Sequence, residues 1–523
     1  MLKEKVINWK WFRREWLFLL PSLLWIGMVA ITTILWSDNR ISSDWSAEII
    51  LAKEMLREGK LVVSDWHYST EIRILYTQLF AIPMFFLFHS WDVIRAAQGC
   101  LLHLVLLLAY CFCMKPTKIS DKWVYLSSIF LFIPFSYTYI DIVHMGQSYQ
   151  PHMILCFLII GMYLRLLEKR SGINMAGIIV LSFLCGLSGI RYLQILFLPL
   201  ILAAIWVYYR SINGVMWAVC SMAFTAIGYC INEKLLHKWF YFGSYSGVKF
   251  AEFQEKNFLE LLADKIGDWF LLFGYAGGEK VMSVAGVCNM LVIISVVILA
   301  YISYTVVRQQ KKEDTKIRFV TVLFVSSLLV NTFVFLVLDN YYTTRYYILV
   351  FFWLPALLAI YLECGQQNKR IRYGICILLL GCLCLIGANT LNTLAQNDQN
   401  EDRKKVADFL EENQLTYGYA TFWNADVITE LTDGEVEVAA ISGCEPFTVY
   451  DWLMPERYLQ RDILKNMEGN QLFILLTWEE YEEYKESTVL KEAGEPVYAG
   501  NGYKVLLYDK EDFWQKYIEQ STK

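Results

Sequence analysis

Charged side chains are scarce in this chain of 523 residues. Asp, Glu, Lys and Arg make up 19% of the sequence and apolar residues 56%, whereas soluble proteins usually carry about 25% charged and 45–50% apolar residues. Over so long a chain, this imbalance argues against a single water-soluble globule.

The few charges are also unevenly distributed. Residues 391–523 have a net charge of −15, whereas residues 1–390 have a net charge of +10 and contain all six histidines. Two bodies in different solvents are therefore predicted. The negative charge of the second body disfavours nucleic acid as a partner.

Cysteine is nearly absent from the acidic segment, which contains only Cys444. A disulfide framework is therefore excluded there. The segment also lacks GxGxxG, P-loop, HExxH and GxSxG motifs, so no chemistry is assigned to it. The other twelve cysteines lie mostly in apolar runs, and pairs such as Cys382 and Cys384 lack CxxC spacing. We interpret these cysteines as helix-packing residues.

Long apolar runs dominate the first 390 residues. A membrane-spanning helix needs about 20 mostly apolar residues, and eleven segments are predicted to span. They are 16–36, 92–114, 123–140, 153–168, 173–189, 191–209, 213–231, 283–307, 319–338, 346–362 and 373–390. The segment 72–88 is shorter and is interrupted by Arg73, Gln78 and Pro83, so hydropathy alone does not decide whether it crosses.

Positive charge decides the orientation, because basic residues concentrate in cytoplasmic loops. If 72–88 does not cross, the basic clusters share the side of the N-terminus. They lie in 1–15, 115–122, 169–172, 210–212, 308–318 and 363–372. We therefore predict a multi-pass protein of the cell membrane with a cytoplasmic N-terminus and an extracytoplasmic acidic domain. The segment 72–88 is then a juxtamembrane or re-entrant piece.

The predicted fold class is a polytopic α-helical membrane protein with a small C-terminal α/β domain. Residues 1–390 form the transmembrane domain and residues 391–523 the acidic domain. In the acidic domain, the patterns predict helices over Glu401–Asn413, Trp478–Glu486 and Glu511–Glu519. They predict strands over Tyr417–Thr421, Glu435–Ile441, Leu472–Thr477 and Lys504–Tyr508.

Polar residues concentrate in the predicted outer loops, chiefly 37–91 and 232–282. The first of these loops contains an amphipathic helix from Trp45 to Glu58, which Gly59 ends. Asp44 precedes this helix and can serve as its N-cap, as a chemical group, or as both. Glu48 lies four residues further on and shares its face.

Other polar residues at the outer helix ends are candidates for ligand contact. They are Glu71, Asp141, His144, His152, Arg191 and Arg345, the last followed by Tyr346. Arg191 and Arg345 either snorkel to the interface or neutralise nearby carboxylates, or they bind an anion such as phosphate, with which guanidinium forms paired charge-assisted hydrogen bonds. The spacing of the histidines fits no metal-ligand motif, so no metal site is predicted.

These residues resemble the motifs of a known superfamily. The segment Ser43–Glu48, just after the first span, resembles the acidic first loop of the GT-C superfamily of multi-span glycosyltransferases, which use polyprenyl-phosphate sugars. Ser69–Arg73 resembles the second acidic element of that loop. Asp141 stands where oligosaccharyltransferase relatives carry a further acidic motif, and Arg345–Tyr346 resembles the late arginine that holds the lipid phosphate. The acidic tail resembles appendages found on some bacterial members.

The resemblance implies that residues 1–390 are a GT-C-like catalytic domain. Such an enzyme transfers a sugar from a polyprenyl-phosphate carrier to a hydroxyl of a cell-envelope polysaccharide, lipid or protein. Asp44 would then be the general base, while Glu71 or Asp141 would orient the substrates. Glu48, His144 and His152 would add substrate contacts. The phosphate-binding residues would be Arg345, Arg191 and Tyr346. No cofactor is expected with a monophosphate carrier, whereas a pyrophosphate carrier favours a divalent cation.

Two other classes of protein stay open. A lipid-sugar flippase or transporter needs ionisable residues near the middle of the membrane, whereas this chain keeps its charges at helix ends. A non-catalytic envelope assembly protein would use the tail to bind a partner and the spans as an anchor. Eleven spans and a polar outer cluster exceed what an anchor needs, so this class ranks last.

Overall fold

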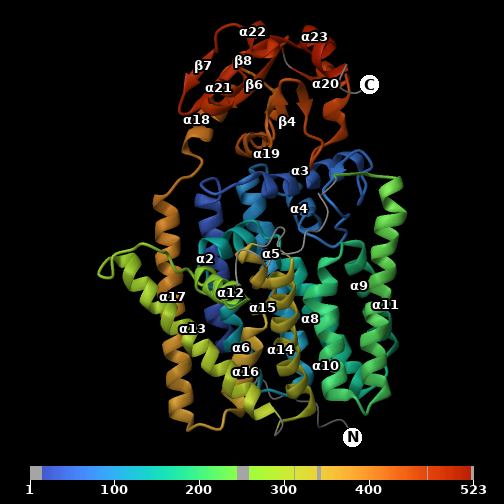
Figure 1. Cartoon of the computed structure of the whole chain (residues 1–523), viewed down its shortest axis with the longest axis vertical. Coiled ribbons are helices and arrows are strands. Elements are labelled where there is room, and N and C mark those ends of the chain that lie inside the picture. Colours follow the sequence, from blue (N-terminus) through green and yellow to red (C-terminus); the bar gives the residue numbers. More distant parts are fainter. Residues whose placement is uncertain (1–14, 244–257, 311–312, 339–342, 468, 520–523) are drawn as a thin grey trace, which may run out of the picture. The chain divides into compact units, whose positions relative to one another are not determined.

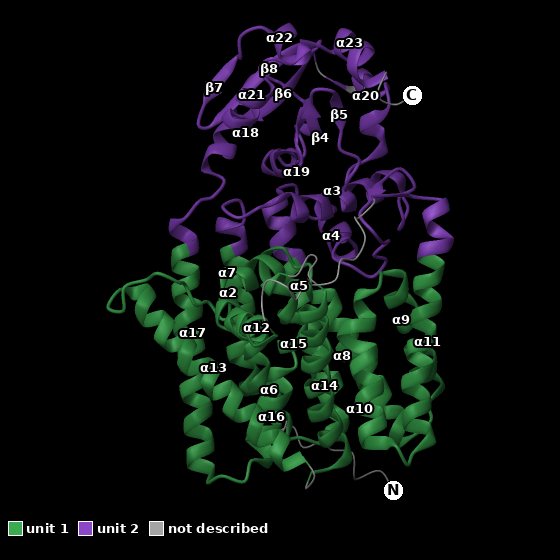
Figure 2. Cartoon of the chain, viewed as in Figure 1, with its two compact units in different colours: residues 1–32, 99–232, 246–393 green, residues 33–98, 233–245, 394–523 purple. Residues whose placement is uncertain are grey.

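The computed structural model of the chain describes residues 15–243, 258–310, 313–338, 343–467 and 469–519 (Figure 1). It consists of two compact units, each made of separate stretches of sequence (Figure 2). Unit 1 comprises Met1–Thr32, Gly99–Asn232 and Ser246–Thr393, and unit 2 comprises Thr33–Gln98, Glu233–Tyr245 and Leu394–Lys523. The sequence predicted the acidic tail as a domain by itself. In the structure the tail shares its compact unit with the whole of the first predicted outer loop, 37–91.

Eight helices in the described part of the chain are long and apolar enough to cross a membrane. They are Trp16–Trp36 (which includes α2, Leu20–Trp36), α5 (Trp91–Met114), α8 (Gln150–Glu168), α11 (Ile212–Lys234), α13 (Val284–Gln309), α14 (Thr315–Val337), Thr344–Cys364 (which ends in α16, Leu354–Cys364) and α17 (Lys369–Gln396). Two shorter apolar helices, α9 (Gly172–Leu187) and α10 (Leu198–Tyr208), add to them. A polytopic helical membrane protein is therefore confirmed.

The prediction of a single spanning helix over 123–140 is wrong. This stretch contains α6 (Asp121–Ser127), a 3₁₀ turn (Ser128–Leu131), a break around Pro134, the short α7 (Tyr137–Tyr139) and the start of a π-helix (Ile140–Met145). Proline has no backbone N–H with which to continue a helix, so the apolar run is divided although its composition suits a span.

The segment 72–88, whose crossing hydropathy left open, contains only one short helix, α4 (Gln78–Phe85). Eight helical residues extend about 12 Å, whereas the hydrocarbon core of a bilayer is about 30 Å thick. The helix is therefore too short to cross a membrane by itself.

The C-terminal part of unit 2 is a six-stranded mixed sheet with the order β5-β4-β3-β6-β8-β7. The strands are β3 (Tyr417–Thr421), β4 (Glu437–Cys444), β5 (Phe447–Val449), β6 (Gln471–Thr477), β7 (Tyr498–Gly500) and β8 (Tyr503–Asp509). β3 pairs in parallel with β4 and β6, whereas β5, β7 and β8 add antiparallel pairs. All four strands predicted from the sequence are present, and β3 has the predicted bounds.

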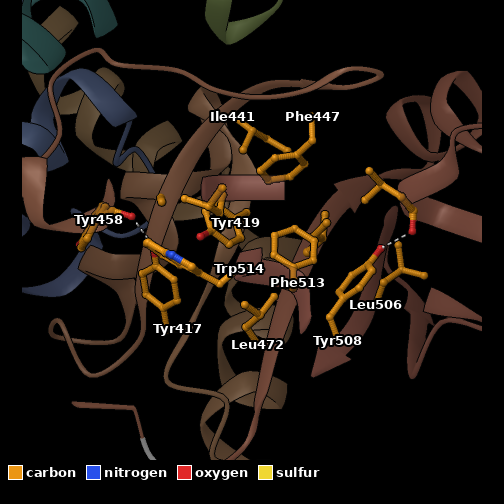
Figure 3. Close-up of a cluster of buried hydrophobic side chains, with 14 of the residues drawn as sticks. Tyr417, Tyr419, Ile441, Phe447, Tyr458, Leu472, Leu506, Tyr508, Phe513 and Trp514 are labelled. Atoms are coloured by element: carbon orange, nitrogen blue, oxygen red, sulfur yellow. Dashed lines mark hydrogen bonds between the residues drawn. The ribbon is translucent and has the colours of Figure 1, made fainter. Parts of the chain in front are cut away.

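Alternating residues of these strands supply two cores. Tyr417, Tyr419 and Ile474 belong to one cluster of buried side chains, whereas Ala420 and Phe473 belong to the other. This alternation follows from the two-residue period of a strand. Figure 3 shows the first core, where Tyr419 and Phe513 pack together and the Tyr417 hydroxyl donates to the carbonyl of Tyr458 at 3.2 Å.

Helices cover this sheet and connect its strands. They are α18 (Glu401–Glu412), α19 (Phe422–Leu431), α20 (Ile463–Asn466), α21 (Trp478–Tyr484), α22 (Thr488–Ala493) and α23 (Lys510–Phe513), which a π-helical turn (Trp514–Ile518) follows. The predicted helices over 401–413, 478–486 and 511–519 are thus confirmed. Helix α19, which begins directly after β3, is not among the predicted helices.

Within unit 2, the first loop packs on the acidic domain through α3 (Ser43–Glu58), which contacts both α4 and α19. Polar contacts add to this packing. Arg457 forms ion pairs with Glu54 of α3 and with Glu437 of β4, and the Asn400 side chain donates to the carbonyl of Asp38 at 2.7 Å. The loop and the tail are therefore joined by helix packing and by polar contacts.

Candidate functional site

Asp44 lies in the first turn of α3. The helix begins at Ser43 with Ser42 as its N-cap, so the interpretation of Asp44 as the N-cap is wrong. Asp44 is exposed, and a carboxylate in the first turn interacts favourably with the positive end of the helix. The side chain is thus placed where it is open to a ligand while the helix terminus stabilises its negative charge.

Glu48 and Glu71 are joined by one arginine. Arg73 Nη1 donates to Glu48 Oε1 at 3.3 Å, and Arg73 Nε donates to Glu71 Oε1 at 3.3 Å. Thr77 donates to the second oxygen of Glu48 at 3.0 Å, and Thr70 donates to Glu71. Two of the predicted acidic residues therefore belong to one hydrogen-bonded cluster. In the sequence, Arg73 stands out as an interruption of an apolar run and as the end of the Ser69–Arg73 motif, with no partner predicted for it.

Glu48 has the electrostatic properties of a proton-transfer group. Burial raises its pKa from 4.5 to about 7, although Arg73 and Thr77 act in the opposite direction, and Asp44 raises it further. A carboxyl group that titrates near neutral pH can both accept and donate a proton under physiological conditions. From the sequence, only an additional substrate contact is expected of Glu48.

Helix α19 brings further carboxyl groups to the N-terminal end of α3. Ser43 Oγ donates to the carbonyl of Phe422 at 2.5 Å. Asp426 is buried, and its burial, together with Asp44 and Glu430, raises its pKa well above the ordinary value. Glu430 forms a buried ion pair with Arg95 of α5. Local sequence gives no signal for these residues, because charged side chains in an amphipathic helix are usually exposed.

In unit 1, a cavity of about 190 Å³ lies beside Arg191 and Tyr346. The Arg191 guanidinium lies over the rings of both Tyr149 and Tyr346, 5.4 Å from each ring centre. Most of the other lining residues are apolar. The wall consists of Ile190, Arg191, Gln194, Ile195, Asn331, Val334, Phe335, Leu338, Tyr346 and Leu349.

One polar pair is present in this apolar wall. Gln194 Nε2 donates to Asn331 Oδ1 at 3.0 Å, and Asn331 Nδ2 donates to the carbonyl of Ser327 at 2.7 Å. Asn331 is fully buried in α14. An apolar cavity with one cation and a few fixed polar groups suits a ligand that has a charged head and an apolar chain.

The other phosphate candidate, Arg345, lies in the 3₁₀ turn Thr344–Tyr347. Its Nε atom is buried and has no hydrogen-bond partner within the described part of the chain. The preceding residues of the sequence motif, 339–342, lie outside the described residues. Asp141 lies in the π-helix Ile140–Met145 and is half-buried.

The two candidate histidines have different surroundings. The His152 ring stacks on Tyr192 at 4.9 Å and meets Tyr149 edge-on at 5.8 Å, so it belongs to the aromatic group around Arg191. His144 is buried elsewhere, and its Nδ1 lies 2.8 Å from Nε2 of His103.

Each unit thus holds a part of the predicted set. Unit 2 carries Asp44 and the cluster of Glu48 and Glu71, whereas unit 1 carries the group of Arg191, Tyr346 and His152. That all these residues act at one site stays a prediction. Among the described residues, no group of three or more His, Cys, Asp or Glu side chains could hold a metal ion.

The fold is GT-C-like, as the sequence motifs led us to expect, and the evidence for this is its similarity to solved structures. It is similar to the crystal structure of ArnT from Cupriavidus metallidurans bound to undecaprenyl phosphate, with a TM-score of 0.52 and 12% sequence identity over 92% of this chain and 97% of that chain. It is also similar to the same protein in the apo state, with a TM-score of 0.52 and 10% identity over the same shares of the two chains. No protein-family model and no curated protein matches the sequence.

Proposed function

We propose that the chain is an integral-membrane glycosyltransferase. It moves a sugar from a polyprenyl-phosphate carrier to a hydroxyl group of a cell-envelope polysaccharide, lipid or protein. One observation carries the proposal, the contact of Arg191 with two tyrosine rings at the wall of a mostly apolar cavity. A guanidinium in such a place can form charge-assisted hydrogen bonds to a lipid phosphate. ArnT, which has a similar fold, was crystallised bound to undecaprenyl phosphate.

The reaction breaks the bond between the anomeric carbon of the sugar and a phosphate oxygen of the carrier. In the proposed mechanism, Asp44 accepts the proton of the acceptor hydroxyl, whose oxygen then bonds to the anomeric carbon as oxocarbenium character develops. Its exposure in the first turn of α3 supports this role, because the base must reach a substrate hydroxyl. The carrier leaves with its phosphate negatively charged.

Arginine side chains would stabilise the departing phosphate. We assign this role to Arg345 and Arg191, with Tyr346 holding the Arg191 guanidinium in place. The buried Nε atom of Arg345 supports the assignment, since within the described residues it has no partner and phosphate oxygens would supply one.

The remaining candidates would orient the substrates. Glu71 and Asp141 would direct the acceptor and the donor, and Glu48 would exchange protons near neutral pH. Of the two histidines we assign substrate contact to His152, which lies in the aromatic group of Arg191. A monophosphate carrier would need no further cofactor, because two arginines match its charge. A pyrophosphate carrier would favour a divalent cation.

The proposal includes an orientation, with the N-terminus in the cytoplasm and the acidic domain outside. Its basis is the placement of the basic loops. A reporter protein fused after Lys523 should be active outside the membrane, whereas one inserted at 210–212 should be active inside. A cytoplasmic signal from the C-terminal fusion would contradict the orientation.

The function is tested with the purified full-length protein and a radiolabelled polyprenyl-phosphate sugar. Asp44→Asn and Arg345→Ala should each reduce transfer at least a hundredfold at equal protein levels, a loss typical of removing a general base or a charge-stabilising donor. Asp402→Asn is the matched control, because Asp402 is an exposed acid in the first turn of α18. Wild-type transfer by both variants would contradict the mechanism. A flippase would move the lipid-linked sugar across a vesicle membrane even with Asp44→Asn.

A further inference from the structure

Four aromatic side chains of the acidic domain form a cluster on unit 2. Phe422 and Trp423 begin α19, and Tyr450 and Trp452 follow β5. The ring centres of Phe422 lie 5.2 Å from Trp423 and 5.6 Å from Tyr450. Tyr450 and Trp452 stack at 6.4 Å with an angle of 25° between their planes. We call these four residues the aromatic platform.

Two rings of the platform are exposed and two, Phe422 and Trp452, are half-buried, although the domain has a core in which to bury aromatic rings. Trp423 is 63% exposed and Tyr450 36%, whereas Tyr419 and Phe513 are buried in the core that Figure 3 shows. A contiguous exposed apolar group on a folded domain usually marks a binding surface, because burying it would otherwise stabilise the fold.

Backbone contacts hold the platform in place. The N–H of Tyr450 donates to the carbonyl of Ala440 in β4 at 2.8 Å, and the N–H of Trp452 donates to the carbonyl of Tyr450 at 2.8 Å. The indole of Trp452 packs so closely on Gly243 that a side-chain methyl group there would overlap it. Rings held in this way lose little conformational entropy when a ligand binds.

The platform lies beside the proposed base. Ser43, next to Asp44, donates its hydroxyl hydrogen to the carbonyl of Phe422. Burial, Asp451 and Asp44 together raise the pKa of Tyr450, so the two carboxylates lie within electrostatic reach of its hydroxyl. The platform thus combines flat apolar faces with hydrogen-bond acceptors.

We infer that the aromatic platform binds a sugar ring of the acceptor next to Asp44, so that the acceptor is a saccharide. The inference rests on the proposed function. A pyranose has an apolar C–H face that stacks on aromatic rings and hydroxyl groups that donate to carboxylates such as those of Asp44 and Asp451. The charge disfavours the other common use of exposed tryptophan, insertion into an anionic lipid surface, because that use needs basic neighbours and residues 391–523 carry a net charge of −15.

The test measures binding of the full-length protein, in lipid nanodiscs, to cell-envelope glycan from the organism that makes it, freed of protein and lipid. Trp423→Ala combined with Trp452→Ala should weaken binding about tenfold. Trp478→Ala is the matched control, because Trp478 is 52% exposed on the same domain but lies outside the platform, and this variant should bind like the wild type.

Three outcomes would overturn the inference. The first is the absence of glycan binding by the wild type, and the second is equal binding by the double variant. The third is a component of tryptophan fluorescence that brominated phospholipids quench in the wild type and that is lost in Trp423→Ala, which would assign the platform to the membrane surface. A separate assay follows hydrolysis of the polyprenyl-phosphate sugar without an acceptor. Glycan binding in a protein that never hydrolyses the donor would contradict the proposed function and leave the saccharide site intact.

Discussion

Arg95 and Glu430 form a buried ion pair within unit 2, although 335 residues separate them in the sequence. Arg95 Nε donates to Glu430 Oε1 at 2.8 Å, and the two side chains are 3% and 2% exposed. The same guanidinium donates to the carbonyl of Trp45 at 3.4 Å. One arginine of α5 therefore links the helix that carries Asp44 to the acidic domain.

Removing one partner of this pair should destabilise unit 2. We expect Arg95→Met to lower the free energy of unfolding by about 3–5 kcal/mol, because it leaves the buried Glu430 carboxylate without its partner. Thermal unfolding in detergent micelles measures the change. The control is Lys485→Met, which breaks an exposed pair with Glu482 and should cost less than about 1 kcal/mol. Arg95→Met combined with Glu430→Leu should recover part of the loss, and a double variant no more stable than Arg95→Met would contradict a pairwise interaction.

Glu48 should make stability depend on pH. Its pKa in the folded protein is about 7, above its ordinary value of 4.5, so the folded state holds the proton more tightly. The resulting stabilisation is complete below pH 4.5 and is lost as the pH rises through 7.

Glu48→Gln imitates the protonated side chain and should remove this dependence. The variant should match the wild type at pH 4.5 and exceed its free energy of unfolding at pH 8, by on the order of 3 kcal/mol at most. Denaturant unfolding over this pH range checks the difference, with the exposed Glu412→Gln as control. Parallel pH profiles of wild type and Glu48→Gln would refute the prediction.

Arg191 should matter for its planar guanidinium as well as its charge. Lysine keeps the charge but can neither stack on Tyr149 and Tyr346 nor form paired hydrogen bonds to phosphate. We expect Arg191→Lys to raise the KM for the lipid-linked sugar about tenfold, which corresponds to ~1.4 kcal/mol. Arg210→Lys is the control, because Arg210 is an exposed arginine beside a single ring, Tyr209. An unchanged KM in Arg191→Lys would argue against phosphate binding at the cavity.

Gly99 of α5 should tolerate no side chain. A Cβ atom there would lie 2.6 Å from Nε2 of Gln147. The Gln147 side chain is fully buried, so its amide has little space into which to move. We expect Gly99→Ala to cost about 1–3 kcal/mol through overpacking.

The matched control for this prediction is Gly381→Ala in α17, where an added Cβ has no neighbour within 4 Å among the described residues. Alanine favours the helix there and should leave stability unchanged or raise it by up to ~1 kcal/mol. The melting temperatures of the two variants are measured in detergent micelles, and Gly99→Ala should melt at the lower temperature. Equal melting temperatures would show that Gln147 can move aside.

Much of the fold could be predicted because its signals are local. Apolar windows located the long helices, and the bounds of β3 followed from a short apolar run between polar residues. The same method fails where one residue outweighs composition. Pro134 divides the run 123–140. Ser42 rather than Asp44 precedes the first turn of α3, because the helix begins at Ser43, two residues before the predicted start at Trp45.

The candidate site depends on pairings that local patterns do not encode. Arg73 was read as a break in an apolar segment, yet it joins Glu48 to Glu71. Helix α19 was missed because it follows β3 without a polar connection, and its buried Asp426 and Glu430 are residue types that sequence reasoning places in water. The contact of His144 with His103 likewise joins two distant segments, which no spacing rule connects.

The discontinuity of unit 2 bears on how the protein is made. The ribosome completes α3 and α5 long before it reaches α19, and at ~5–20 residues per second the intervening stretch takes on the order of tens of seconds. Throughout that interval, α19 has not been synthesised, so Arg95 and the apolar face of α3 lack their contacts with it. During this interval the nascent loop is therefore most exposed to proteases, and it is then that a chaperone is most needed.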